Sequence, residues 1–129
     1  MPLDEREFIP SGGQAALALE TLVHPPAELE RALVALNDSR ARFETTAERS
    51  FLATIGASCS TPVGVKATVS SYSVVLRAIL FAGDGSSEIA DEIEEPLDVD
   101  LAPSNADSLG ARLGERMLAR GADRLITHE

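Results

Sequence analysis

The stretch that decides the fold is residues 63–95, VGVKATVSSYSVVLRAILFAGDGSSEIADEIEE. Residues 63–69 alternate apolar with polar or small side chains, residues 74–82 are almost entirely apolar, and residues 88–94 follow the sequence GDGSS. Alternation with a period of two is typical of a strand with one buried face, and runs of Gly, Asp and Ser mark turns. The stretch therefore predicts three consecutive antiparallel strands joined by short turns.

The third of these strands carries most of the charge. Five acidic residues fall within residues 88–95, which indicates an edge strand with one face in solvent. Arg77 is the one charged residue of the second strand. We expect a carboxylate partner for it rather than a ligand.

A helix is expected before the strands, over residues 39–55. Its apolar residues recur every four positions, which places them on one face: Phe43, Ala47, Phe51 and Ile55. Gly56 is expected to end this helix. The loop that contains the only cysteine follows.

Another helix is expected after the strands, within PSNADSLGARLGERMLARG, residues 103–121. Ser104 and Asp107 resemble a capping box, Gly121 suits the C-terminal end, and the buried stripe consists of Leu109, Leu113 and Met117. The order helix–strand–strand–strand–helix predicts an α+β fold. In it, a three-stranded antiparallel sheet has its helices on one face.

A strand–helix segment is expected to precede this unit. Within FIPSGGQAALALE, residues 10–13 have the composition of a loop, and residues 15–20 could form a short strand with Leu17 and Leu19 on one face. After HPP at 24–26, a helical stripe follows: Leu29, Leu33 and Leu36. This divides the chain into residues 1–38 and residues 39–129.

Composition excludes several functions. The formal net charge is −10, which disfavours nucleic acid, although the expected order of elements is also that of double-stranded RNA-binding domains. No apolar run reaches membrane-spanning length, and MPLDEREF lacks the features of a secretory signal. One cysteine cannot form an internal disulfide, so we expect a cytoplasmic protein.

Cys59 lies in the expected loop IGASCSTPVG. A cysteine that acts as an enzymatic nucleophile usually has a base or a cation nearby, and the two histidines, His24 and His128, are far away in the sequence. No second thiol is available to complete a metal site. From the residues alone, Cys59 is either a small buried apolar residue or a functional residue on a loop with small neighbours.

The residues around Cys59 match a longer pattern. Residues 46–64, TAERSFLATIGASCSTPVG, resemble the cofactor-attachment signature of the porphobilinogen deaminase (hydroxymethylbilane synthase) family. The matching positions are Glu48, Arg49, Ala57, Ser58, Cys59, Thr61, Pro62, Val63 and Gly64. Upstream, Gly13, Gln14, Ala16 and Leu17 resemble the family's Pro-x-x-Gly-Gln-Gly-Ala-Leu stretch, in which Ala15 replaces the usual glycine, and residues 76–86 resemble its strand and Asp-Gly turn.

The resemblance covers nearly the whole chain but only the C-terminal part of a three-domain enzyme. It implies that residues 1–38 are the last strand and helix of the family's first domain, and that residues 39–129 are its third domain. The implied activity is that of a transferase in tetrapyrrole and haem biosynthesis, which joins four porphobilinogen units into hydroxymethylbilane with loss of ammonia. The catalytic aspartate and the basic substrate-binding residues belong to the missing domains. The chain alone is therefore expected to be inactive.

The resemblance also implies the site residues. Cys59 would hold a dipyrromethane cofactor through a thioether, and in this chain alone the thiol is expected to be unmodified. Gly13 and Gln14 would approach the cofactor through backbone groups, unless the glycines simply form a turn. If the backbone at Ala15 has a positive φ, alanine costs about 1 kcal/mol there. Glu48 and Arg49 are expected to cap and pair around the helix and loop.

Two expectations concern partners. The family implies the missing N-terminal domains and the porphobilinogen-derived pyrrole chain. Without those domains, the strand and Leu stripe expected within residues 1–36 would be exposed, and a second copy of the chain could pair with them. The alternative function is a stand-alone α+β regulatory or interaction domain, which would need neither catalysis nor a free thiol.

Overall fold

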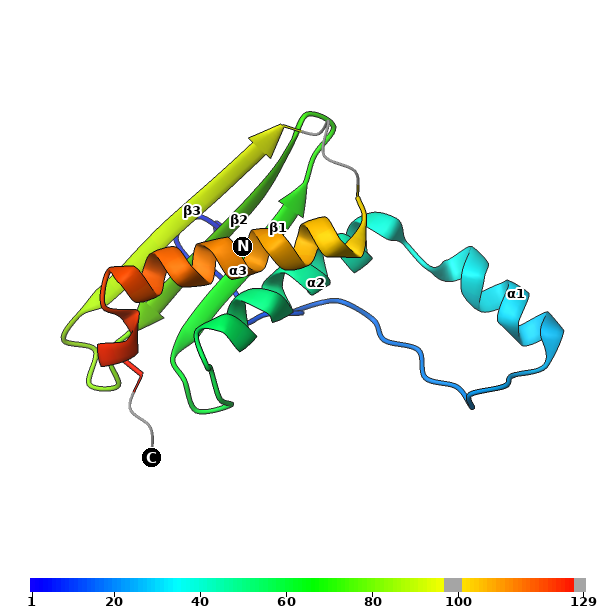
Figure 1. Ribbon diagram of the computed structural model, residues 1–129, viewed down its shortest axis with the longest axis horizontal. Helices are drawn as coiled ribbons and strands as arrows, with labels where there is room; N and C mark the ends of the chain where they lie inside the picture. Colours follow the sequence, from blue (N-terminus) through cyan, green and yellow to red (C-terminus); the bar gives the residue numbers. More distant parts are fainter. Residues whose placement is uncertain (97–100, 127–129) are drawn as a thin grey trace.

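The computed structural model describes residues 1–96 and 101–126. In this part of the chain the elements are α1 (Ala27–Leu36), α2 (Ser39–Thr54), β1 (Val63–Val69), β2 (Ser73–Phe81), β3 (Glu88–Pro96), α3 (Pro103–Ala119) and the short 3-10 helix η1 (Ala122–Arg124). The order α2–β1–β2–β3–α3 is the expected one (Figure 1).

The three strands form one antiparallel sheet in the order β1-β2-β3. Val65 of β1 lies opposite Ala78 of β2, and Leu76 of β2 lies opposite Ile93 of β3. Because side chains alternate along a strand, these four residues point to the same face of the sheet. The alternation in residues 63–69 therefore predicted both β1 and its buried face.

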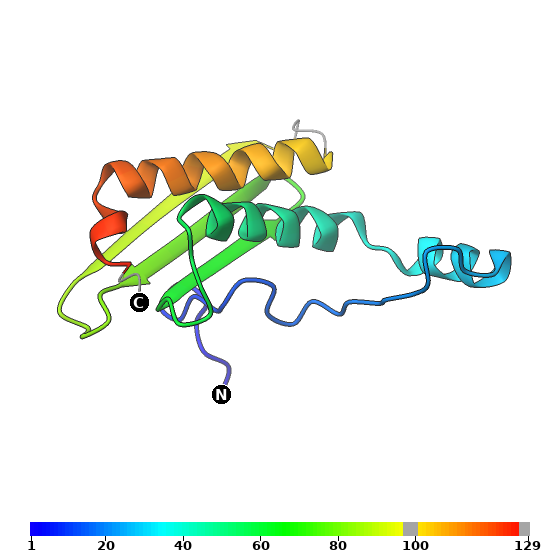
Figure 2. The same cartoon turned by 60° about the horizontal axis from the view of Figure 1, so that its bottom comes forward.

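Helices α2 and α3 cover that face side by side (Figures 1 and 2). The helical residues expected to be buried are buried, and they join the inner face of the sheet in one core: Phe43, Ala47, Phe51, Ile55, Val65, Ala67, Val69, Val74, Leu76, Ala78, Leu80, Ile93, Ala106, Leu109, Leu113, Met117, Ala122 and Ile126. The predicted α+β class, with its helices on one face of the sheet, is confirmed.

The two helices approach each other closely because α3 presents glycines to α2. A Cβ atom built on Gly110 would lie 2.2 Å from the carbonyl oxygen of Ala47, and one built on Gly114 would lie 2.7 Å from Cγ2 of Thr54. The first contact is with rigid backbone and the second with a side chain. Gly110 is therefore the more demanding position of the two.

The acidic strand β3 is an edge strand, as expected, but its charges are not all left to solvent. Arg77 pairs with Glu92, as its position in β2 predicted. From α3, Arg112 pairs with Glu95, and Arg116 reaches Asp91 at 2.7 Å. The ion pairs from α3 connect the helix to the strand.

The start of α3 corrects one expectation. Pro103 is its first residue, Ala102 is the N-cap, and no side chain caps the helix, so the predicted capping box of Ser104 and Asp107 does not form. Proline suits this first position because it has no N–H to satisfy. At the other end, Gly121 follows the helix with φ +93°, which is the left-handed conformation expected of it.

The segment before α2 also differs in part from expectation. Residues 15–20 form no strand, and they lie outside the sheet that β1, β2 and β3 form in the described part of the chain. The helix after HPP is present as α1, but it has no buried residue. Figure 2 shows this segment extending away from the sheet and its two helices.

Candidate functional site

The Cys59 loop begins at a well-defined helix end. The N–H of Ala57 donates to the carbonyl of Leu52 at 2.9 Å, and the N–H of Gly56 donates to the carbonyl of Ala53 at 3.1 Å. Gly56 has φ +69°. These two bonds around a left-handed glycine form a Schellman motif, which ends α2 as expected and fixes the direction of the chain that follows.

Cys59 then lies in a tight turn. The N–H of Thr61 donates to the carbonyl of Ser58 at 3.1 Å, and Oγ1 of Thr61 accepts from the N–H of Ser58 at 2.9 Å. Oγ of Ser58 also lies 3.0 Å from Oγ of Ser60. The Cys59 side chain is exposed. The hydroxyl groups therefore brace the turn, while the thiol faces solvent.

The loop is also attached to the sheet. The N–H of Phe81 in β2 donates to the carbonyl of Pro62 at 3.0 Å, and β1 begins at the next residue. Cys59 thus lies on a short loop held at one end by α2 and at the other by β2. Of the two interpretations left open by the residues, the buried apolar one is wrong.

The surroundings of Cys59 limit its chemistry. Within the described residues there is no group of three or more His, Cys, Asp or Glu side chains that could hold a metal ion. His24 is exposed in the segment before α1, and His128 lies outside the described residues. An exposed thiol of this kind can form a bond to an external electrophile. If that electrophile is already activated, the attachment needs no catalytic dyad beside the thiol.

The second expected site, Gly13–Gln14, lies in a turn against α2 and β1. The N–H of Gln14 donates to the carbonyl of Ser11 at 3.2 Å, and the N–H of Gly13 donates to Oε2 of Glu48 at 2.6 Å. Both Gly13 and Gln14 line a hollow of about 150 Å³ together with Lys66. Cys59 is not among the residues that line it, so this hollow does not unite the two expected sites.

The backbone of this turn has a strained position. Gly13 has φ +75°, which glycine adopts readily, but Ala15 has φ +67°. It is the one non-glycine residue with a positive φ in the described part of the chain. The positive φ on which the expected cost at Ala15 depended is therefore present, and alanine in this conformation costs about 1 kcal/mol.

Glu48 has a structural role that its sequence context did not reveal. It was expected to cap and pair around the helix, but its side chain is buried, with 3% of the residue exposed. One carboxylate oxygen accepts from the N–H of Gly13, and the other accepts from the N–H of Ala67 in β1 at 2.8 Å. The available signal was its position beside Ala47 on the buried face of α2. The neighbouring Arg49 is exposed.

The part of the chain that contains the Cys59 loop and Glu48 is similar to known proteins. Residues 42–119 match the family model described as the C-terminal domain of porphobilinogen deaminase. The chain belongs to the porphobilinogen deaminase family. The predicted family is thereby confirmed, and both the Cys59 loop and Glu48 fall within the matched residues.

Individual family members are similar over more of the chain. A porphobilinogen deaminase of Aliarcobacter butzleri (strain RM4018) is 36% identical over 126 residues, which cover 97% of this chain and 38% of that protein. One of Natranaerobius thermophilus is 34% identical over 121 residues, or 93% of this chain and 38% of that protein. The similarity therefore extends beyond the domain model. The chain spans less than two fifths of the length of these relatives.

No helix in residues 1–96 or 101–126 combines the length and the apolar character needed to cross a membrane.

Proposed function

We propose that this chain is the cofactor-carrying part of a porphobilinogen deaminase, and that Cys59 is the residue to which the dipyrromethane primer is attached. The observation that supports this most directly is the position of the only cysteine. Its thiol is exposed on a braced turn inside the residues that match the family's C-terminal domain.

The residues around the thiol suit a bulky covalent group. The neighbours in the loop are Gly56, Ala57, Ser58 and Ser60, none of which has a large side chain. The hydroxyl groups of Ser58, Ser60 and Thr61 bond within the turn, so attachment to Cys59 would not break the contacts that hold it. The turn therefore presents a fixed thiol with space around it.

The attachment step needs only the thiol of Cys59 and an activated aminomethyl-pyrrole. Sγ would form a bond to the methylene carbon, the bond from that carbon to the amino nitrogen would break, and ammonia would leave with the thiol proton. When bound, the dipyrromethane supplies the pyrrole carbon to which further porphobilinogen units are added. Cys59 itself holds the chain and takes no part in later bond formation.

The rest of the proposed enzyme lies outside this chain. The chain carries 21 acidic and 11 basic residues, whereas a substrate with acetate and propionate side chains calls for a cationic pocket. We place that pocket and the catalytic aspartate in the additional length that the relatives have. Residues 1–38 would then belong with that part, residues 39–129 would form the third domain, and the whole enzyme would work in the cytoplasm.

The Gly13–Gln14 turn is a secondary part of this proposal. The side chain of Gln14 is exposed, and the turn is tied to the cofactor-carrying domain through Glu48. Backbone groups of this turn could contact the bound pyrroles only if the group attached at Cys59 extends toward it. Cys59 is therefore the residue on which the proposed function is tested.

The test compares variants of the full-length protein that contains this chain. Intact-mass measurement of the purified protein should show an added mass of two pyrrole units in the wild type and none in Cys59→Ser, which should also lose all deaminase activity. Ser60→Ala is the matched control, because it changes the next residue of the turn and keeps the thiol. It should carry the added mass. A Cys59→Ser protein that retains the dipyrrole and its activity would overturn the proposal.

The alternative of a stand-alone interaction domain predicts a different result. Such a protein would bind its partner through a surface, so Cys59→Ser would be silent and no variant would carry a pyrrole mass. The same two measurements therefore distinguish the two functions.

A further inference from the structure

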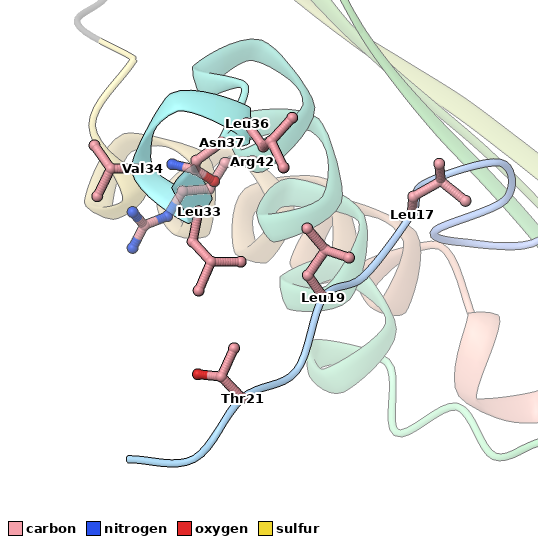
Figure 3. A pocket seen from close by; sticks show the side chains of 8 residues that line it. All are labelled: Leu17, Leu19, Thr21, Leu33, Val34, Leu36, Asn37 and Arg42. Atoms are coloured by element: carbon pink, nitrogen blue, oxygen red, sulfur yellow. The ribbon is translucent and has the colours of Figure 1, made fainter. Parts of the chain in front are cut away.

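The outer edge of β3 is a part of the domain that another strand could reach. β3 is the last strand of the sheet in the described part of the chain, so one side of it pairs with no strand there (Figure 1). Free N–H and carbonyl groups on such an edge are a template for strand addition. Another open region, the hollow that Leu19 and Leu33 line (Figure 3), is formed mainly by residues that we have placed with the additional polypeptide of the relatives.

The hydrogen bonds of the sheet show which groups of β3 face outward. In β1, the N–H of Val65 donates to the carbonyl of Pro10, which lies outside the sheet. Because bonding alternates along antiparallel strands, Ala78 of β2, which lies opposite Val65, bonds to β3 instead. Its partner there is Asp91. The N–H and carbonyl groups of the residues on either side of Asp91 therefore face the free edge.

Two of these outward-facing groups are already bound by side chains. The carbonyl of Ala90 accepts from Nη1 of Arg120 at 2.8 Å, and the N–H of Glu92 donates to Oδ1 of Asp91 at 2.8 Å. Arg120 lies at the C-terminal end of α3. A strand that paired with β3 at this point would need both backbone groups, so it would have to displace both side chains.

Asp91 connects these contacts. It lies opposite the buried Ala78, so its side chain points to the inner face of the sheet, and 12% of that side chain is exposed. Oδ1 also accepts from Arg116 at 2.7 Å, and Oδ2 lies 3.6 Å from Arg120. A charged side chain that points inward on an edge strand opposes strand addition, because the added strand would cover the charge.

We propose that Asp91, Arg116 and Arg120, which we call the edge cluster, close the edge of β3 against strand addition, and that two copies pair along this edge when the cluster is broken. Identical edges related by a two-fold axis pair antiparallel. The edge of β1 is also closed, because Glu44 and Glu48 of α2 accept N–H groups of that strand. Association along β3 would therefore stop at a dimer.

The main test is Asp91→Val in the full-length protein that contains this chain. Valine suits a strand, and residue 91 lies on the same face as the buried Ile93, so the variant should fold with an unchanged circular dichroism spectrum. The substitution removes the acceptor for the N–H of Glu92 and the counter-charge of both arginines. We expect light scattering to show a mass that doubles as the concentration rises, whereas the mass of the wild type stays constant.

Glu94→Val is the matched control. It makes the same change of charge on the same strand and introduces the same side chain, but residue 94 lies on the outer face, next to Ile93 in the strand. This variant should therefore keep the wild-type mass. Association of Glu94→Val as strong as that of Asp91→Val would contradict the role of the edge cluster, because loss of charge alone would then explain it.

The place of the contact has its own test. The N–H of Ala90 faces the free edge, so proline at this position leaves the bonds to β2 intact and blocks pairing on the outer side. Adding Ala90→Pro to Asp91→Val should restore the wild-type mass. A dimer that survives this second substitution would overturn the proposal, because it would form through another surface.

Arg120→Ala tests the same edge from α3. The arginine side chain is 52% exposed, and its removal frees the carbonyl of Ala90 without changing a residue of the sheet. We expect this variant to dimerise at higher concentrations than Asp91→Val, and it decides the question if Asp91→Val does not fold. An unchanged mass in folded Arg120→Ala and Asp91→Val proteins would show that the edge cluster does not control association. The test does not depend on the deaminase function, because it uses only β3 and α3.

Discussion

Ala15 occupies a left-handed backbone conformation that is unfavourable for alanine. The replacement of glycine by alanine in a Gly-Gln-Gly context indicated a penalty only if φ were positive, and φ is +67°. The turn is held to the rest of the protein because the next-but-one residue on its N-terminal side, Gly13, donates to the buried Glu48. Strain at Ala15 therefore reduces the stability of a segment that folds with the domain.

We predict that Ala15→Gly raises the free energy of unfolding by up to about 1 kcal/mol, because glycine adopts this conformation without a steric penalty. Urea denaturation followed by circular dichroism would measure the change. Ala16→Gly is the control, because residue 16 has no positive φ. Glycine there should only lower the free energy of unfolding, through the entropic cost of ordering it. A loss of stability in Ala15→Gly would show that the turn does not need this conformation.

Cys59 and Glu48 differ in how far sequence could determine their roles. Small neighbours and a loop context favoured an exposed thiol, since these depend on residues adjacent in the chain. The role of Glu48 depends on the N–H groups of Gly13 and Ala67, which are 35 and 19 positions away. Only folding brings those groups to one carboxylate, so no local pattern in the sequence indicates the pairing.

At the scale of elements, Glu48 joins three parts of the protein: α2, β1 and the turn at Gly13. Glu48→Gln keeps the shape of the side chain but replaces one accepting oxygen by an NH₂ group that faces a backbone N–H. Since a hydrogen bond to a charged group contributes about 1.5–3 kcal/mol, we expect Glu48→Gln to lower the free energy of unfolding by about 2 kcal/mol. Hydrogen exchange at the Gly13 or Ala67 amide should become faster.

Glu44→Gln is the matched control. Glu44 is one helical turn earlier on α2 and accepts a single N–H, from Val69 at 2.8 Å, from a half-buried position. We expect a smaller loss there and no change in exchange at Gly13. Equal effects of the two substitutions would mean that the contact with Gly13 contributes nothing.

At the α2–α3 contact, we expect a Gly→Ala substitution to change stability in the direction opposite to that expected from helix propensity alone. Gly→Ala at an exposed helical position stabilises by roughly 1 kcal/mol. At Gly110 the new methyl group would meet the Ala47 carbonyl oxygen and the Phe51 amide nitrogen, so the helices must separate. We expect Gly110→Ala to destabilise by about 1–3 kcal/mol, the usual cost of overpacking.

Thermal or urea unfolding would measure the effect of Gly110→Ala, with Ser108→Ala as a control on the exposed side of the same helix. The control should leave stability nearly unchanged or slightly raised. A gain in stability for Gly110→Ala would mean that the helices are not packed backbone to backbone at this point.

The elements themselves were predictable where a local pattern was enough. Alternation predicted β1, an apolar run predicted β2, and the turn sequence before an acidic segment predicted β3. The four-residue spacing of Phe43, Ala47 and Phe51 predicted α2. The strand expected at 15–20 did not form, because a strand requires hydrogen-bonding partners that the described part of this chain does not supply. The capping box failed for a local reason: Pro103 begins α3 one residue before Ser104.

On the scale of the whole molecule, the negative net charge of this chain is compatible with a site of covalent attachment but not with a binding pocket for an anionic substrate. Its net charge of −10 would repel a substrate that carries several carboxylates, while a thiol attached to the outside of the domain needs no such pocket. The proposed division of labour follows from this difference. Under the proposed function, the chain would present the anchor, and the cationic site would belong to polypeptide that the longer relatives have in addition.

We therefore predict that the 129-residue chain, incubated with porphobilinogen, forms no tetrapyrrole and keeps an unmodified Cys59. Absorbance of the oxidised products would detect turnover, with the full-length enzyme as the positive control, and intact-mass measurement would detect any attached pyrrole. The native chain should also react completely with iodoacetamide, because Cys59 is exposed. Complete alkylation would show that the thiol is accessible, so a missing pyrrole would then reflect the lack of the substrate-binding site. Appreciable turnover by the chain alone would mean that this α+β domain holds a catalytic site of its own.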